Sequence, residues 1–105
     1  METRVLGKSD LKVSTVCFGA WPIGGGMGRV DPQEAVKTIH AAINAGIAFI
    51  DTAEGYQTSE SVLGQALKSR RDSVILATKL SGPDHSASHI RNALENSLSA
   101  LNTEY

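Results

Sequence analysis

The sequence predicts an α/β fold in which parallel strands are covered by helices. Along its 105 residues, short apolar runs alternate with stretches of helical periodicity, which is typical of repeated strand–helix units. The runs are apolar at every position and not at every second one. We therefore expect both faces of each strand to be buried, as they are in a parallel sheet. No segment closely repeats another, and no linker divides the chain.

The N-terminal part of the chain is predicted to be a small hairpin followed by a first strand. Short apolar and polar stretches within residues 3–13 flank the turn-forming sequence Gly7-Lys8-Ser9-Asp10. Residues 15–19 form an apolar run, which indicates a short buried strand. The glycine-rich stretch 24–28 matches neither dinucleotide-binding nor phosphate-binding glycine patterns. We interpret it as a flexible loop between strand and helix.

The first long helix is predicted to begin after Asp31, whose side chain can cap it. Pro32 suits the first helical position, and Glu34 can reach back toward the cap. Apolar residues recur with the helical period over residues 36–43. Gly46 then supplies the left-handed residue that ends the helix.

Two further strand–helix units follow. Residues 47–50 are predicted to form a strand that ends at Asp51, and residues 74–77 a strand that leads into Thr78 and Lys79. Between them we expect a helix over residues 59–68, with an inner face made of Val62, Leu63, Ala66 and Leu67. We expect a last helix, capped by Ser88, to pack through a stripe of Ile90, Leu94, Leu98 and Leu101. The chain ends where we expect a fourth strand to begin.

Composition argues against several classes of partner. The formal net charge is −1 with both signs interspersed, so we expect no nucleic-acid surface. No window approaches the ~18 apolar residues of a membrane helix, and residues 1–4 lack the apolar core of a secretory signal. The single Cys17 cannot form an internal disulfide, which fits a cytoplasmic location, and we interpret it as a small core residue. The histidines, which we expect at the surface without a metal, are His40, His85 and His89.

Two charged residues follow apolar strands directly. Asp51 and Lys79 are expected to meet, because parallel strands end at the same edge, where α/β folds place their active sites. Tyr56 lies five residues after Asp51, in the loop that leaves this edge. A nearby ammonium makes a phenol a stronger acid, so the three side chains form a candidate general-acid site for carbonyl reduction. The alternative is a structural ion pair beside a surface tyrosine, and the spacing alone favours neither.

The segment from Gly46 to Tyr56 reads GIAFIDTAEGY and is followed by Ser59-Glu60 and Leu63-Gly64. This run resembles the signature of the aldo-keto reductase family. Residues 6–14 resemble the hairpin that plugs the bottom of that family's barrel. The sequence Ala77-Thr78-Lys79 resembles the family's lysine strand, and residues 97–105 resemble the approach to its strand four. The details are most similar to the microbial-type branch, which acts on small aldehydes, sugars or aryl carbonyls.

The resemblance implies a role for each matching residue. Tyr56 would be the general acid, Lys79 the cation that makes this phenol more acidic, and Asp51 the partner of Lys79 that also contacts the nicotinamide end of NADPH. Gly19-Ala20-Trp21 resembles the Gly-Thr-Trp that lines the family's cofactor and substrate pocket, although Ala20 lacks the threonine hydroxyl. The family's catalytic histidine after strand four and its main phosphate-binding segments fall outside these residues. The family chemistry needs no metal.

We therefore expect residues 1–105 to be the N-terminal part of a single (β/α)8 TIM-barrel domain, with the hairpin and about three units present. The resemblance implies NADPH-dependent reduction of a small carbonyl substrate to an alcohol. We expect the isolated chain to be inactive and to self-associate through its open sheet edges. Two alternatives stay open. One is a small α/β protein that binds a ligand or regulates a redox partner without catalysis, and the other is a truncated product with no independent role.

Overall fold

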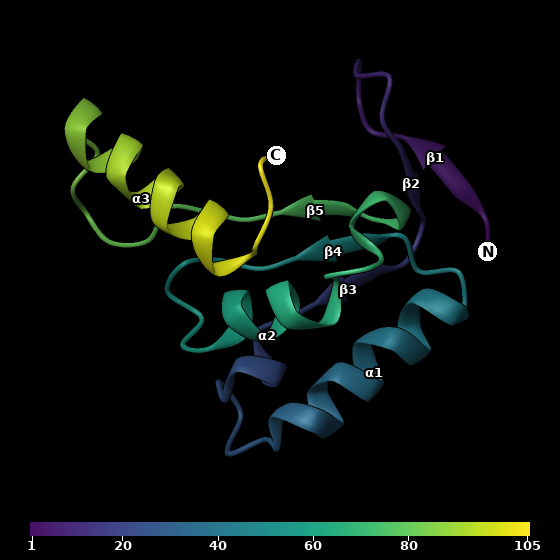
Figure 1. Ribbon diagram of the computed structural model, residues 1–105. Helices are drawn as coiled ribbons and strands as arrows, with labels where there is room; N and C mark the ends of the chain where they lie inside the picture. The colour runs from purple at the N-terminus through teal and green to yellow at the C-terminus, as the bar shows by residue number, and fades with distance from the viewer.

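The computed structural model describes residues 1–105 and contains a hairpin followed by a parallel sheet (Figure 1). The hairpin pairs β1 (Thr3–Val5) with β2 (Lys12–Ser14) in antiparallel orientation. The sheet consists of β3 (Cys17–Gly19), β4 (Phe49–Asp51) and β5 (Ile75–Ala77), which are parallel and adjacent in that order. The predicted hairpin and parallel strands are confirmed, and β3 and β5 are the two edges.

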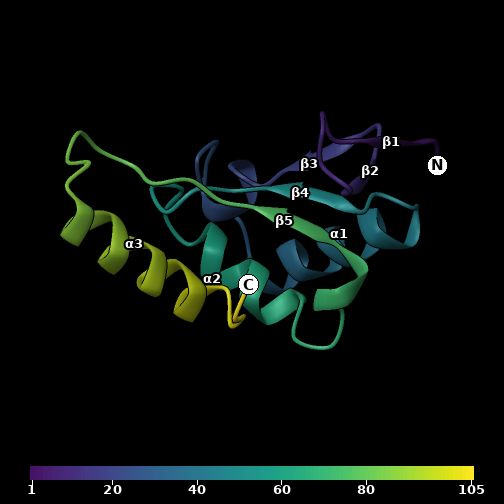
Figure 2. The same ribbon diagram turned by 90° about the horizontal axis from the view of Figure 1, so that it is seen from above.

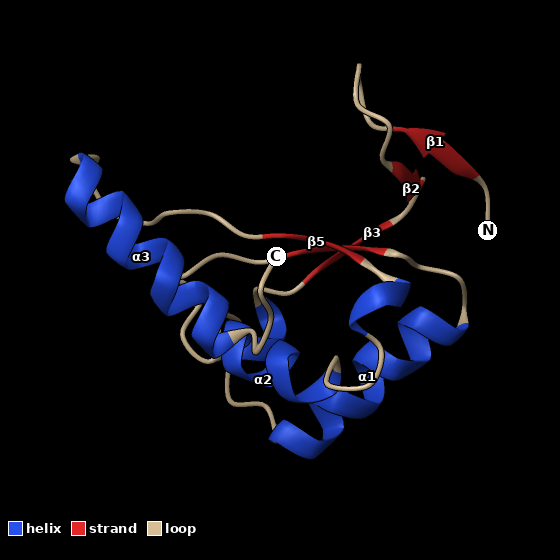
Figure 3. Cartoon of the chain, turned by 45° about the horizontal axis from the view of Figure 1, so that its top comes forward, coloured by secondary structure: helices blue, strands red, loops and turns tan.

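An α-helix follows each strand of the parallel sheet. The three helices are α1 (Pro32–Asn44), α2 (Ser59–Ala66) and α3 (Ala87–Ala100), and the short 3-10 helices are η1 (Pro22–Gly24) and η2 (Arg71–Ser73). All three α-helices lie on one side of the sheet, as Figures 2 and 3 show from two further directions. No helix has the length and apolar character needed to cross a membrane.

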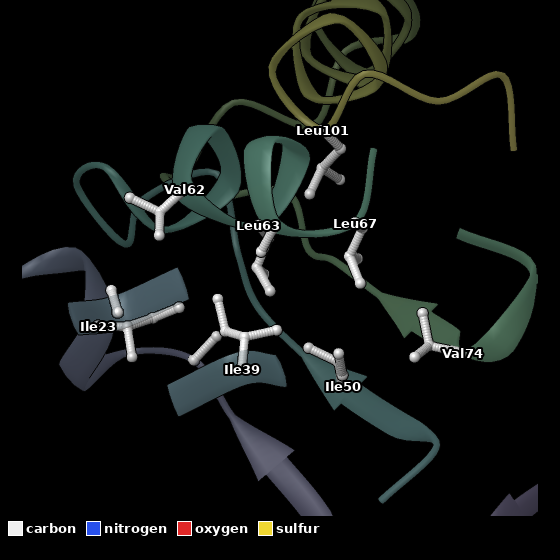
Figure 4. Close-up of a cluster of buried hydrophobic side chains, with 11 residues drawn as sticks. Ile23, Ile39, Ile50, Val62, Leu63, Leu67, Val74 and Leu101 are labelled. Carbon is white, nitrogen blue, oxygen red and sulfur yellow. The ribbon is translucent and has the colours of Figure 1, made fainter. Parts of the chain in front are cut away.

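The core lies between this side of the sheet and the helices (Figure 4). Because successive side chains of a strand point to opposite faces, Ile50 of β4 faces the helices and is only 1% exposed. It joins one apolar cluster with Ile39 of α1 and with Leu63 and Leu67 near α2. The inner face predicted for the second helix is confirmed.

The opposite side of the sheet is open. Phe49 and Ile75 are half-buried there, and Cys17 is exposed. The expectation that the strands are buried on both faces is therefore wrong for this chain, because its helices form a single layer and supply no second wall. The interpretation of Cys17 as a core residue is wrong for the same reason.

The signals for the start and end of α1 are confirmed, with one exception. Asp31 Oδ1 accepts hydrogen bonds from the backbone N–H of Gln33 at 2.9 Å and of Glu34 at 3.2 Å. Gly46 has a φ of +92°, the left-handed conformation that favours glycine. The Glu34 carboxylate does not reach back to the cap, because it instead accepts a hydrogen bond at 2.6 Å from Lys37 one turn later.

The beginning of α3 differs from the prediction. Ser86, and not Ser88, is the N-cap, since its Oγ accepts a hydrogen bond from the His89 N–H at 3.4 Å. Asp84 Oδ1 accepts a hydrogen bond from the Ser86 N–H at 2.9 Å. That contact holds Ser86 in the turn before the helix, so the first helical residue is Ala87.

The apolar stripe of α3 is only partly used for packing. Leu101, just after the helix, is buried, whereas Ile90 is 45% and Leu94 is 54% exposed. Ile90 and Leu94 line a hollow of about 170 Å³ between α3 and the end of β5. The packing predicted for the whole stripe is therefore wrong at its N-terminal half, where no further element covers the helix.

Two close contacts tie the helices to one another. His40 Nε2 lies 2.8 Å from the Ala66 carbonyl oxygen, so this histidine links α1 to α2 and is not the surface residue we expected. α2 and α3 meet at Gly64, where an added Cβ would lie 2.3 Å from the Ala100 carbonyl oxygen. Only glycine allows the two backbones to approach this closely.

Candidate active site

The carboxyl edge of the sheet brings Asp51 and Lys79 into contact. The Lys79 ammonium donates hydrogen bonds to Asp51 Oδ2 at 2.7 Å and to the Thr52 carbonyl oxygen at 2.7 Å. Strand register pairs Asp51 with Ala77, so Lys79 lies two residues beyond that partner and its side chain reaches back across the edge. The predicted meeting of the two charges is confirmed.

Tyr56 lies against the same ammonium. Lys79 Nζ is 5.1 Å from the centroid of the Tyr56 ring, within the range of a cation–π contact. The Tyr56 carbonyl oxygen accepts a hydrogen bond from the Ser59 N–H at 2.9 Å, which ties its loop to the beginning of α2. The structure thus brings together all three residues for which the sequence predicts a catalytic role.

The electrostatics of Lys79 keep it charged. Partial burial lowers the pKa of its ammonium, but the hydrogen bond and the charge of Asp51 raise it by more, and Tyr56 raises it further. The net pKa lies above the ordinary value of 10.5. A permanent cation therefore sits beside a phenol at the sheet edge, although 47% of the lysine side chain and 37% of the aspartate side chain are exposed.

Gly19 and Ala20 occupy different environments at the end of β3. Gly19 pairs in register with Asp51, and a Cβ added there would meet no atom within 4 Å, so space is open beside the ion pair. Ala20 is fully buried in the core cluster, which leaves its methyl group without access to the open side of the sheet. Its N–H donates a hydrogen bond to the Asp51 carbonyl oxygen at 2.8 Å.

Trp21 is 48% exposed and stands at the beginning of the glycine-rich loop. A Cβ added to Gly26 would lie 2.2 Å from the Trp21 indole nitrogen, so the indole packs directly against this glycine. The Trp21 carbonyl oxygen accepts hydrogen bonds from the N–H groups of Gly24 and Gly26, both at 3.3 Å. Trp21 therefore anchors its own loop while presenting the rest of its ring to solvent.

Cys17 lies on the open face but is not an activated nucleophile. Partial burial raises the pKa of its thiol and the Asp51 carboxylate raises it further, while Lys79 has a smaller opposite effect. The thiol is therefore protonated near neutral pH, and a thiol in that form is a weak nucleophile.

Sequence reasoning missed a set of buried polar groups beneath the site. Thr52 Oγ1 and Ser59 Oγ lie 2.8 Å apart, and both residues are fully buried. Thr78 donates a hydrogen bond from its hydroxyl to Glu60 Oε1 at 2.6 Å. One signal was available, because Ser59 precedes Val62 by three residues and therefore falls on the apolar stripe of α2.

Comparison with known proteins identifies the family of this chain. The model of the Aldo/keto reductase family matches residues 15–105. L-galactose dehydrogenase of Arabidopsis thaliana is 40% identical over the whole chain, and aldo-keto reductase YhdN of Bacillus subtilis is 37% identical over the whole chain. The chain spans 36% of the length of each of these two relatives.

Solved structures give the same result. Aldo-keto reductase AKR11C1 from Bacillus halodurans superposes with a TM-score of 0.88 at 35% identity, covering 100% of this chain and 38% of that one. The thermostable aldo-keto reductase Tm1743 gives a TM-score of 0.88 at 30% identity, covering 100% of this chain and 40% of that one. The predicted fold class is confirmed, since these residues have the fold of the N-terminal part of a TIM barrel. The chain belongs to the aldo-keto reductase family, whose members related to it include oxidoreductases.

Proposed function

We propose that the chain provides catalytic residues for NADPH-dependent reduction of an aldehyde or ketone to an alcohol. The observation that carries the proposal is the placement of one ammonium, that of Lys79, in contact with both Asp51 and the Tyr56 ring. Two relatives have names that fit the reduction of a carbonyl group, although the second is named for NADH and not for NADPH. One is 6-dehydroglucose reductase of Novosphingobium aromaticivorans, 37% identical, and the other is NADH-specific methylglyoxal reductase of Escherichia coli, 44% identical over 75% of the chain.

Each side chain has a distinct task in this proposal. Tyr56 donates its hydroxyl proton to the carbonyl oxygen as negative charge develops there. Lys79 stabilises the phenolate that remains, because an adjacent cation favours the anionic form. Asp51 holds Lys79 in place by accepting a hydrogen bond from its ammonium. The fixed ammonium needs little reorganisation during the reaction, which is how preorganised charges lower a barrier.

The edge of the sheet fits the nicotinamide end of the cofactor. Open space beside Gly19, opposite Asp51 in register, leaves room for a flat ring to approach the backbone. The exposed part of the Trp21 ring can serve as a neighbouring wall, whereas we assign Ala20 a packing role behind it. When bound, the reduced nucleotide would supply the hydride for the carbonyl carbon.

We also propose that residues 1–105 are the N-terminal part of one barrel domain of a cytoplasmic protein, with no metal in its chemistry. The parallel edge of β5 and the uncovered side of the sheet support the barrel part of this proposal, because a closed barrel continues with further strands at such an edge. The chain spans 36% of L-galactose dehydrogenase, so activity is expected once the remaining units are supplied.

The test uses a chimera in which this chain is joined to the remaining barrel units of YhdN. We expect the chimera to oxidise NADPH in the presence of a small aldehyde, with NADH and a set of sugar and aryl carbonyls as comparisons. Lys79→Met in the same chimera should lose this activity while retaining the fold by circular dichroism. A folded, nucleotide-binding chimera that reduces no carbonyl would contradict the proposal.

A non-catalytic regulatory role is the second candidate. It is favoured by one relative, named probable voltage-gated potassium channel subunit beta of Oryza sativa subsp. japonica, which is 36% identical over the whole chain. Such a protein would bind a partner without turning over a carbonyl substrate. One experiment separates the catalytic role from the regulatory role. The chimera is titrated with NADPH while nucleotide fluorescence is followed, and an aldehyde is then added. Binding without aldehyde-dependent oxidation favours regulation.

A further inference from the structure

The first turn of α2 contacts the ends of all three parallel strands. Ser59 Oγ donates a hydrogen bond to the Ala20 carbonyl oxygen after β3 at 2.9 Å, and it lies 2.8 Å from Thr52 Oγ1 after β4. The next residue, Glu60, accepts the hydrogen bond of the Thr78 hydroxyl after β5 at 2.6 Å. Two consecutive side chains thus join three separate strand ends from beneath the site.

Glu60 is an unusual residue at a buried position of α2. Its side chain is buried, at 8% exposure, and its hydrogen-bond partner is a neutral hydroxyl. No lysine, arginine or histidine forms a salt bridge with it. The loss of hydration at this position is unfavourable for a carboxylate without a cation, and the hydrogen bond gained in exchange comes from Thr78. Its contact with Thr78 therefore calls for an explanation other than stability.

Both contacts lead to Lys79. Thr78 is its immediate neighbour, so the bond to Glu60 fixes the backbone from which the lysine side chain extends. Thr52 provides one of the two acceptors of the ammonium through its carbonyl oxygen, and Ser59 holds Thr52 through its hydroxyl. The backbone next to Lys79 and one hydrogen-bond acceptor of its ammonium are thus held by the same helical turn.

We propose that Ser59 and Glu60 are positioning residues that place the Lys79 ammonium against Asp51 and Tyr56. This inference rests on the proposed function, because precise placement of Lys79 matters only if the ammonium has a chemical task. Neither side chain hydrogen-bonds to the ammonium itself, which donates to Asp51 and to the Thr52 carbonyl oxygen.

The test measures the reactivity of the lysine amine in the full chain and needs no cofactor or substrate. Trace acetic anhydride labels lysines in competition, and mass spectrometry gives the rate at each lysine from pH 7 to 11. Thr78→Val removes the hydroxyl, keeps the shape and leaves the Glu60 charge in place. Only the neutral amine reacts with the anhydride, so a Lys79 ammonium that is less well placed against Asp51 should react faster. We expect the acylation rate of Lys79 at pH 9 to rise about threefold or more, which corresponds to a fall of roughly half a unit in the pKa of Lys79.

Matched variants separate positioning from charge. Thr78→Ser keeps the hydroxyl and should restore the parent rate, and Lys37, in its exposed pair with Glu34, should keep its rate throughout. Glu60→Gln removes the charge but keeps an acceptor, so it should change the Lys79 rate less than Thr78→Val does. An unchanged rate in Thr78→Val, or a larger effect of Glu60→Gln, would overturn the proposal.

A second pair of variants tests the contact between Ser59 and Thr52. It also keeps the proposal testable if Thr78→Val unfolds, which uniform acylation rates at all lysines would reveal. Ser59→Ala should raise the Lys79 rate, whereas Ser61→Ala, in the same turn but exposed and bonded only to the Thr58 carbonyl oxygen, should not. Equal rates in these two variants would overturn the role of Ser59. Because labelling does not depend on turnover, a chimera that reduces no carbonyl would contradict the proposed function and leave this result intact.

Discussion

Lys79 lies with its ammonium 5.1 Å from the centre of the Tyr56 ring, although the two residues come from different strand–helix units. Tyr56 stands in the loop between β4 and α2, and Lys79 follows β5. The contact therefore depends on the pairing of β4 with β5 and on the tie between the tyrosine loop and Ser59. The phenol and the ammonium meet only in the folded chain.

Tyr56→Phe in the completed barrel is expected to reduce turnover by a factor on the order of 10²–10⁴, because a positioned general acid is lost. The ring and its packing against Lys79 remain, so NADPH affinity should change little. Steady-state kinetics and fluorescence titration measure the two quantities. Near-parent turnover in this variant would exclude Tyr56 as the acid.

Lys79→Met and Asp51→Asn should act on the same step. Lys79→Met removes the cation, and Asp51→Asn removes the carboxylate that orients it. The double variant is therefore expected to lose much less activity than the product of the two single losses. Independent, multiplicative losses would show that the two side chains are not coupled.

The ion pair should make stability depend on pH in the alkaline range. The pKa of Lys79 is raised in the folded chain, so its contribution is fully present below the unfolded-state pKa of about 10.4 and is lost as pH rises through the higher folded value. The effect should stay below about 1 kcal/mol, because the pair is half exposed. Urea unfolding of the YhdN chimera and of its Lys79→Met variant should give stabilities that differ at pH 8 and converge at pH 12.

Gly64→Ala should destabilise the fold by roughly 1–3 kcal/mol, because the added methyl group must displace the backbone at Ala100. Gly19→Ala is the matched control for stability, since its methyl group would enter open space. Chemical unfolding of both variants, each made in the YhdN chimera, measures the difference in stability. Equal stability of the two would mean that α2 and α3 do not approach at Gly64 as described.

The isolated chain is expected to associate and to oxidise no NADPH in the presence of an aldehyde. Its sheet has two free edges, and Ile90 and Leu94 are about half exposed on α3. Sedimentation velocity at several concentrations measures the association, and co-expression with the remaining barrel units should abolish it. A monodisperse monomer with sharp, cooperative unfolding would contradict this expectation.

The order of elements could be predicted because its signals are local. Asp31 before a proline, a glycine at position 46 and continuous apolar runs each act within a few residues, and the structure confirms what they indicate. The meeting of Asp51 and Lys79 required one additional rule, that parallel strands end at the same edge.

Most of the features that were mispredicted or missed depend on partners that are distant in sequence. Whether Cys17 or Leu94 is buried depends on a second layer, which no local pattern reveals. The choice between Ser86 and Ser88 as the cap is an exception, because it depends on a local hydrogen bond from the Ser86 N–H to Asp84, two residues earlier. The buried role of Glu60 depends on a hydroxyl 18 positions away in sequence, and a charged residue in a helix is normally taken to be solvated.

Alternation along β4 places Ile50 in the core and, one residue later, Asp51 at the site. A shift of one residue in the pairing of this strand would exchange the two, putting a carboxylate among Ile39 and Leu63 and an isoleucine in water. Such a misfolded form would be too unstable to persist. A chain that folds stably therefore carries Asp51 on the open face, and well-folded register isomers with this carboxylate in the core do not accumulate.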